Sequence, residues 1–389
     1  MNLLPPLFLS NTFNRFFDSE KLSGILLIIC TIVAIMMANS SVGHDYLSLW
    51  HTQFFGMSLE HWINDGLMAI FFLLIGLELR REIYIGELSN IKNALLPICA
   101  ATGGMLVPAL IHFSLNQATP TQNGIFIPMA TDIAFALGVL AILGNRIPAS
   151  LKVFVVAFAV IDDLGAILII AAFYTAKLSV WYLIVAFVFW ALLMLLNRFF
   201  RVITLLPYLI GGVLMWILML KSGIHATTAG IMLAFAIPFS EKDDDQVSPS
   251  YKLENLLHKP VAFIILPIFA LANTGITLSG DWMHDLSSLN SLGITMGLIL
   301  GKPLGITLFC FMAVAIGVCR LSSDLKWGHI IGAGILGGIG FTMSIFITNL
   351  AFTEDPATIN AAKMSILIAS LTAGILGFLW LKIMQRTQP

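Results

Sequence analysis

The stretch VVAFAVIDDLGAILI (residues 155–169) places two adjacent acids, Asp162 and Asp163, in the middle of an apolar run. They are the only charged residues between Lys152 and Lys177 in the sequence. One charge near the centre of a bilayer costs about 2.5–3.5 kcal/mol, so an adjacent pair costs about twice that amount. No packing requirement explains two acids at this place, and we interpret them as a functional site around which the rest of the chain is arranged.

The composition is that of a membrane protein. Of 389 residues, 58% are hydrophobic and 11% are charged, whereas soluble domains carry about 25% charged residues. The mean hydropathy is +0.94, and apolar runs of about 20 residues recur along the chain. These features exclude a large soluble domain and predict an all-α polytopic membrane protein. The four cysteines lie in apolar stretches without metal-ligand spacing, which predicts buried thiols.

The apolar runs and the turn signals between them predict twelve transmembrane helices. Lys and Arg are concentrated in alternate connecting segments, and the segments on the other side hold only Lys177 and Lys221. By the positive-inside rule, this alternation predicts that both termini are cytoplasmic. The predicted spans are 23–40, 59–79, 95–115, 121–143, 151–174, 180–198, 204–220, 223–239, 259–279, 290–318, 327–350 and 357–384.

We expect one integral membrane domain over residues 1–389. Residues 1–22 are predicted to be a cytoplasmic or interfacial N-terminal segment. The outer linker 44–60 mixes aromatic and polar residues, and it could form a hairpin or a partner surface. Residues 240–258 include an acidic, Pro- and Ser-containing stretch and are predicted to be a cytoplasmic linker between two halves. In the second span, Asn64 and Asp65 are interpreted as a helix cap.

Three spans place ionisable side chains at one depth. Asp132 in span four, Asp162 in span five and Lys302 in span ten each lie roughly 16–18 Å from a span end, which is near the bilayer midplane. If they share one interior, Lys302 can pair with a carboxylate and offset part of the cost of burying both charges. We therefore expect these side chains to lie together.

Two spans carry signs of an interruption. Pro128 lacks an N–H donor and disturbs the helix just before Thr131 and Asp132. Residues 332–340 of span eleven contain five glycines, which are poor helix formers. Interruptions at corresponding places of two halves are typical of transporters with inverted repeats that bind ions near the midplane. Close packing between helices is the alternative explanation for the glycines, and we favour two interrupted helices.

A second group of charges lies at the cytoplasmic ends of two spans. Glu78, Arg81 and Glu82 share one helix face, and Glu254 and His258 repeat the spacing of four before span nine. Taken by themselves, these residues favour a solvated helix end with ordinary positive-inside charges. A role in the response to pH is the alternative.

The residues Ala130-Thr131-Asp132, Asp162-Asp163 and Lys302, at these separations, resemble the NhaA family of bacterial sodium–proton antiporters. The resemblance extends over essentially the whole chain. It implies that Asp163 is the main carboxylate for Na⁺ or Li⁺, and that Asp162 pairs with Lys302 and exchanges protons. It implies further that Thr131 and Asp132 compensate helix N-termini where the two interrupted helices cross at the midplane, and that Lys302 compensates the C-termini.

The resemblance has implications outside the ion site as well. The Glu78, Arg81, Glu82, Glu254 and His258 positions match the family's cytoplasmic pH-response cluster. The linker 44–60 corresponds to a dimerising β-hairpin, so we expect a homodimer. The family's location is the bacterial inner membrane, its partners are Na⁺, Li⁺, H⁺ and membrane lipid, and it implies no cofactor and no nucleic-acid partner.

The chemistry of a buried acid pair suits ion exchange. Hard cations such as Na⁺ and Li⁺ require oxygen ligands, and a carboxylate binds them only when it is deprotonated. Competition of protons and cations for one site, open to one side at a time, gives pH-regulated antiport of cytoplasmic Na⁺ against external H⁺. The antiport is electrogenic when the carboxylates, or Asp163 together with the Lys302 ammonium, release more protons than the charge of the bound ion. Such exchange serves pH homeostasis and salt tolerance.

Other functions fit the residues less well. A sodium-coupled symporter of an organic solute is the alternative, although Lys302 is the sole buried base that could bind such a solute. An intramembrane aspartyl protease would place its acids on separate spans, so we expect no enzymatic activity. A channel is disfavoured, because a site that is costly to empty suits exchange better than conduction.

Overall fold

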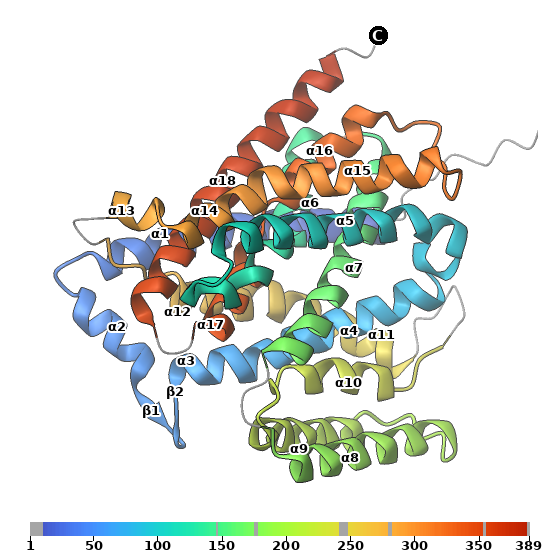
Figure 1. Cartoon of the computed structure of the whole chain (residues 1–389). Helices are drawn as coiled ribbons and strands as arrows, with labels where there is room; N and C mark the ends of the chain where they lie inside the picture. Colours follow the sequence, from blue (N-terminus) through green and yellow to red (C-terminus); the bar gives the residue numbers. More distant parts are fainter. Residues whose placement is uncertain are drawn as a thin grey trace, which may run out of the picture.

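The computed structural model describes residues 11–144, 147–174, 178–240, 248–278, 282–352 and 355–386, and almost all of its elements are helices (Figure 1). Within this part of the chain, eight segments are long and apolar enough to cross a membrane. They are Leu59–Tyr84, Asn93–Asn116, Pro120–Leu143, Ala149–Phe173, Val180–Arg198, Pro249–Asn273, Leu289–Ala315 and Pro356–Gln385. Two bent pairs of helices bring the number to ten. The predicted class, an all-α polytopic membrane protein, is confirmed.

The helices and strands follow one another as α1 (Asn11–Ala38), α2 (Gly43–His51), β1 (Gln53–Phe54), β2 (Met57–Ser58), α3 (Leu59–His61), η1 (Trp62–Leu67), α4 (Met68–Tyr84), η2 (Glu87–Ser89), α5 (Ile91–Asn116), η3 (Pro120–Met129), α6 (Ile133–Leu143), α7 (Ala149–Phe173), α8 (Val180–Arg198), α9 (Leu206–Ser222), α10 (Thr228–Ala236), α11 (Pro249–Pro260), η5 (Val261–Ile265), α12 (Leu266–Asn273), α13 (Trp282–Leu286), α14 (Leu289–Met296), η6 (Gly297–Gly301), α15 (Lys302–Ala315), α16 (Trp327–Gly337), α17 (Phe341–Ala351) and α18 (Pro356–Arg386).

Two of the predicted spans correspond to short helices. Helix α9 has 17 residues and α10 has 9 residues. At about 1.5 Å per residue, a helix as short as α10 covers less than half of a hydrocarbon layer about 30 Å thick. In Figure 1, α8 and α9 lie side by side at one edge of the molecule, and α10 lies between them and α4. The number of twelve spans stays a prediction.

The linker at residues 44–60 contains a short hairpin. Strands β1 and β2 pair antiparallel, with Gln53 opposite Ser58 and Phe54 opposite Met57. The two turn residues have positive φ angles, 49° at Phe55 and 81° at Gly56, which suits the right-handed twist of a two-residue hairpin turn. Helix α2 forms the other part of the linker and meets α1 at 113°.

Parts of the predicted terminal and central linkers are helical. Residues 1–10 lie outside the described part, and α1 begins at Asn11, inside the predicted N-terminal segment. Residues 241–247 also lie outside it. The rest of the predicted linker 240–258 is largely helix α11, whose first turn is capped by Ser248, since its hydroxyl oxygen accepts a hydrogen bond from the Tyr251 amide at 3.2 Å.

Glycines allow α5 and α15 to cross closely next to the site. A methyl group added at Gly103 of α5 would collide with the carbonyl oxygen of Gly305 in α15, and one added at Gly305 would collide with that of Gly103. Lys302 lies three residues before Gly305, so the same crossing sets the depth and direction of its side chain. The glycine pair therefore belongs to the framework of the site.

We expect Gly305→Ala to destabilise the protein by about 1–3 kcal/mol, because the added methyl group meets backbone atoms that cannot turn aside. Thermal unfolding of the purified protein in detergent measures this effect. Gly374→Ala is the matched control, since a methyl group there would meet the Ile339 side chain at 3.7 Å, an ordinary contact. Equal unfolding temperatures for the two variants would contradict a tight α5–α15 crossing.

Candidate functional site

Helix α7 carries both adjacent acids into the interior. Asp162 is fully buried and Asp163 is 3% exposed. The Asp162 Oδ2 atom accepts a hydrogen bond from the Lys302 ammonium at 2.7 Å, and Lys302 is itself fully buried. The predicted contact between spans five and ten is therefore present in the structure.

The Lys302 ammonium has a second partner. It donates to the Thr131 hydroxyl oxygen at 2.8 Å, and that hydroxyl donates to the Gly337 carbonyl oxygen at 2.9 Å. Gly337 is the last residue of α16, where backbone carbonyls lack helical partners and carry partial negative charge. The positive charge of Lys302 thus faces a helix C-terminus through one hydroxyl group.

The break predicted in span four is present. Residues 120–129 form a 3₁₀ helix, the next residues up to Asp132 are extended, and α6 begins at Ile133. Pro128 explains why regular α-helical bonding stops here, because it lacks an N–H donor. Asp132 is the residue before α6, and one of its carboxylate oxygens accepts from the Phe135 amide at 3.5 Å.

The break predicted in span eleven is also present. Helix α16 ends at Gly337, α17 begins at Phe341, and the two helices are bent by 45°. The second carboxylate oxygen of Asp132 accepts from the Thr342 amide at 3.1 Å and from the Thr342 hydroxyl at 2.7 Å. One carboxylate therefore lies at the N-termini of both α6 and α17, where negative charge is favoured.

The two breaks contact each other through the backbone. The Asp132 amide donates to the Ile339 carbonyl oxygen at 2.6 Å. Interrupting a helix in a bilayer leaves backbone groups that need partners inside the protein. Here each break supplies partners to the other, which explains how both are tolerated in the interior.

Asp163 lines a small cavity. The cavity has a volume of about 70 Å³ and also borders Asp132 and Thr342. The Oδ1 atom of Asp163 is buried and has no hydrogen-bond partner among the described residues. The other lining residues are Phe71, Leu74, Ile75, Glu78, Thr131, Ile133, Ala134, His258, Val261, Ala262, Leu266 and Met343. The cavity thus extends from the middle of α7 to Glu78 on α4 and His258 on α11.

The second group of predicted residues gathers at the far end of this cavity. The Arg81 guanidinium forms an ion pair with the Glu254 carboxylate at 3.2 Å, which joins α4 to α11. Glu78 and His258 line the cavity itself, and Glu82 lies on the same helix as Arg81. The structure therefore brings charges from two distant segments to the mouth of the space that holds Asp163.

Thr342 is a residue of the site that the sequence did not predict. It follows the glycine-rich break by two residues and supplies both a backbone and a side-chain donor to Asp132. A hydroxyl residue in the first turn after a helix break is a weak signal by itself. Only the contact with Asp132, 210 positions away in the chain, gives Thr342 its place in the site.

We expect Lys302→Met to destabilise the protein by about 3–5 kcal/mol, because it leaves the buried Asp162 carboxylate without its cation. Adding Asp162→Asn removes the unpaired charge and should recover much of the loss. Unfolding of the two single variants, the double variant and the parent in detergent gives the coupling between the two residues. Additive effects of the two substitutions would contradict a direct buried pair.

Comparison of the sequence with known proteins identifies a family. A family model described as Na⁺/H⁺ antiporter 1 matches residues 14–381. The chain is 67% identical over 378 residues to a protein of Dechloromonas aromatica named Na(+)/H(+) antiporter NhaA, with 97% of each chain covered.

Relatives in other bacteria extend this similarity. A protein of the same name from Cytophaga hutchinsonii is 58% identical over 371 residues, with 95% of each chain covered. One from Vibrio cholerae is 48% identical over 377 residues, with 96% of this chain and 98% of the relative covered. Both the family match and these identities extend over nearly the whole chain, and the expected resemblance is confirmed. The chain is a multi-pass membrane protein that belongs to the NhaA family of Na⁺/H⁺ antiporters.

Proposed function

We propose that the protein is an electrogenic antiporter that exchanges cytoplasmic Na⁺, or Li⁺, for external H⁺. One observation carries the proposal: of two adjacent buried acids, Asp162 is tied to Lys302, whereas Asp163 borders a cavity and forms no ion pair with a described residue. The names of the relatives, all Na⁺/H⁺ antiporters, agree with it.

Asp163 is the proposed cation ligand. A carboxylate in a buried site is neutralised either by a proton or by a cation, so the two compete for it. The Asp132 carboxylate and the Thr342 hydroxyl border the same cavity and offer further oxygen atoms. Carbonyl groups and water would complete the shell that a hard monovalent cation requires.

The proposed stoichiometry follows from the second acid. Binding of one Na⁺ at Asp163 displaces the proton on that carboxyl group. When the bound cation also weakens the Asp162–Lys302 ion pair, the Lys302 ammonium loses its charge partner and releases a second proton. More than one proton for each Na⁺ makes transport electrogenic, so the proton-motive force drives Na⁺ out of the cell.

Exchange requires that the site faces one side of the membrane at a time. We propose the family's architecture for this step: twelve spans in inverted repeats, with both termini cytoplasmic in the bacterial inner membrane, and two interrupted helices that cross at the midplane. The hydrogen bonds between the breaks at Asp132 and Ile339 support the crossing. In this orientation the cavity that reaches Glu78 and His258 faces the cytoplasm.

The size of the cavity argues against the symporter. Sites for organic molecules commonly have volumes of about 300–1,000 Å³. The cavity beside Asp163 has about 70 Å³, which is room for a cation and a few water molecules. A single small ion is therefore the better cargo for this site.

The surface linker and the lipid contacts complete the proposal. We propose that residues 44–60 join two copies of the chain, because Phe54 and Phe55 of the hairpin are exposed and Phe55 is 83% accessible. Apolar side chains exposed along the spanning helices are suited to contact with lipid tails. A homodimer in the membrane is the expected assembly.

We expect Asp163→Asn to abolish Na⁺-dependent proton flux in inside-out vesicles, because an amide neither binds the cation as a charged ligand nor releases a proton. A pH-sensitive dye inside or outside the vesicles follows the flux. Asp45→Asn is the control, since Asp45 is exposed in α2, far from the cavity. Flux of the Asp163 variant with unchanged apparent Na⁺ affinity would overturn the assignment.

We propose a pH-response role for Glu78, Arg81, Glu82, Glu254 and His258. Their position at the cavity mouth supports this role, because charges there act on the protonation of acids further inside. Ion competition at Asp163 alone is the rival explanation of any pH dependence.

We expect Glu254→Gln to move the curve of exchange rate against pH to lower pH by roughly a few tenths of a unit. Loss of a negative charge makes neighbouring acids release protons more readily, so the cation competes successfully at a lower pH. Flux measured across pH at a fixed Na⁺ concentration checks the shift. An unchanged curve would contradict a pH-response role of these residues. Ion competition at Asp163 would then be the explanation of the pH dependence.

A further inference from the structure

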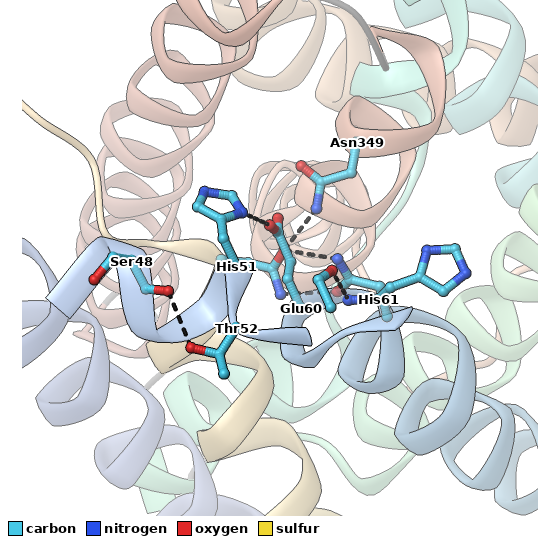
Figure 2. A network of polar contacts seen from close by, with 9 residues as sticks. Ser48, His51, Thr52, Glu60, His61 and Asn349 are labelled. Atoms are coloured by element: carbon cyan, nitrogen blue, oxygen red, sulfur yellow. Dashed lines mark hydrogen bonds and ion pairs between the residues drawn. The ribbon is translucent and has the colours of Figure 1, made fainter. Parts of the chain in front are cut away.

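Three amide side chains meet at the end of the molecule opposite to Arg81 and Glu254, which we call the outer end. Asn64 lies in η1, Asn273 is the last residue of α12, and Asn349 lies in the last turn of α17. Asn64 was interpreted as a helix cap, but its side chain bonds to another span instead. Figure 2 shows the amide nitrogen of Asn349 at the end of a dashed line, which marks its hydrogen bond to this group.

Asn273 is the centre of the group and is 1% exposed. Its amide nitrogen donates to Asn64 Oδ1 at 2.9 Å and to the Phe269 carbonyl oxygen at 3.0 Å. Its oxygen accepts from Asn64 at 3.2 Å and from Asn349 at 2.6 Å. The central amide therefore uses both of its donors and both lone pairs, so a partner that leaves exposes a buried polar group.

One face of α17 connects the ion cavity to this group. Thr342 and Met343, at the start of α17, line the cavity. One turn further, the Phe346 ring packs against the Phe72 ring of α4, with centroids 5.6 Å apart. After one more turn comes Asn349, about 10 Å along the helix from Thr342. Along α17, first the two buried rings and then the amide contact therefore lie between the residues that line the cavity and the outer end.

The spans at residues 59–84 and 249–273 are joined at both of their ends. Arg81 and Glu254 pair at one end, and Asn64 and Asn273 exchange two hydrogen bonds at the other. These two spans therefore form one unit. Asp163 of α7, Thr342 of α17 and Asp132, the residue before α6, also line the cavity and belong to other helices. The Asn349–Asn273 bond is the amide contact that joins this second group of helices to the unit.

We propose that the hydrogen bond from Asn349 to Asn273 is the outer latch of the transporter, which breaks when the cavity opens to the outside. The proposal rests on the proposed exchange function, because the exchange cycle includes an outward-open state. Breaking the bond lets α17 and the Phe346 ring move away from Phe72 and α12. The Asn64–Asn273 bonds stay intact in both states, because they lie within one unit.

The first test measures access to the cavity and does not require ion transport. In a background with the four native cysteines replaced by alanine, Ala134→Cys places a thiol in the cavity lining. A membrane-impermeant thiosulfonate reagent is added to intact cells, and in parallel to inside-out vesicles. We expect Asn349→Ala to speed labelling from the outside roughly fivefold. This is the factor by which the loss of one hydrogen bond, at its net free energy, raises the population of the outward-open state. Labelling from the inside should slow.

Asn197→Ala is the matched control for this test. The Asn197 amide also bonds between helices, donating to the Ala236 carbonyl oxygen at 2.9 Å, but it joins α8 to the end of α10. It should leave both labelling rates unchanged. Equal outside labelling for Asn349→Ala and the parent would overturn the latch, whatever the exchange activity of the chain.

The second test locks the contact. Asn273→Cys with Asn349→Cys, joined by a short bis-thiosulfonate linker, should stop Na⁺-dependent proton flux, and a reductant should restore it. The matched pair Asn64→Cys with Asn273→Cys ties residues of one unit, so its flux after linking should equal the flux of the same pair before linking. Continued flux through the linked 273–349 pair would overturn the latch. Absence of flux in the parent protein, before any linking, would instead contradict the proposed exchange function. In that case the labelling test would still show whether the Asn349–Asn273 bond controls access from the outside.

Discussion

The ion pair between Lys302 and Asp162 is the contact on which the rest of the structure depends. Two charges in a low-dielectric interior offset part of each other's desolvation cost when they meet at short range. Here the ammonium reaches Asp162 and Thr131 at 2.7 and 2.8 Å. That geometry requires α15 to lie close to α5 and α7, which the Gly103–Gly305 crossing permits. It also leaves the adjacent Asp163 as the acid that borders the cavity.

The buried helix ends follow the same electrostatic rule. Breaks in two helices expose N–H and carbonyl groups where no water is available to bond them. The Asp132 carboxylate accepts hydrogen bonds from N–H groups at the start of α6 and α17. The Lys302 ammonium reaches the last carbonyl of α16 through the Thr131 hydroxyl. The charges of the site therefore stabilise the breaks, and the breaks hold the charges in place. Neither would be tolerated alone at this depth.

The cavity and the outer amides divide the helices into two groups. One group contains the breaks and the acid pair, and the other contains the spans at residues 59–84 and 249–273. Within the second group the two spans are tied by polar contacts at both ends, whereas the two groups meet mainly through apolar side chains, including the Phe72 and Phe346 rings, and through the Asn349–Asn273 bond. An apolar boundary of this kind suits relative movement of rigid units, which is the common basis of alternating access in transporters with inverted repeats.

The sequence alone determined the class of protein, the acid pair, its cation Lys302 and the places where two helices break, because burial costs and helix propensity are local properties of the chain. The residues by themselves left open which acid faces the cavity, and only the family resemblance indicated Asp163. The 113° turn between α1 and α2 and the shortness of α10 were not predicted. Thr342 was not predicted either, and Asn64 was assigned the wrong role. These features depend on partners far away in the chain, 210 positions for Thr342 with Asp132 and 209 for Asn64 with Asn273. Only the tertiary structure decides such contacts, because a polar side chain takes its role from the group it meets when the helices pack.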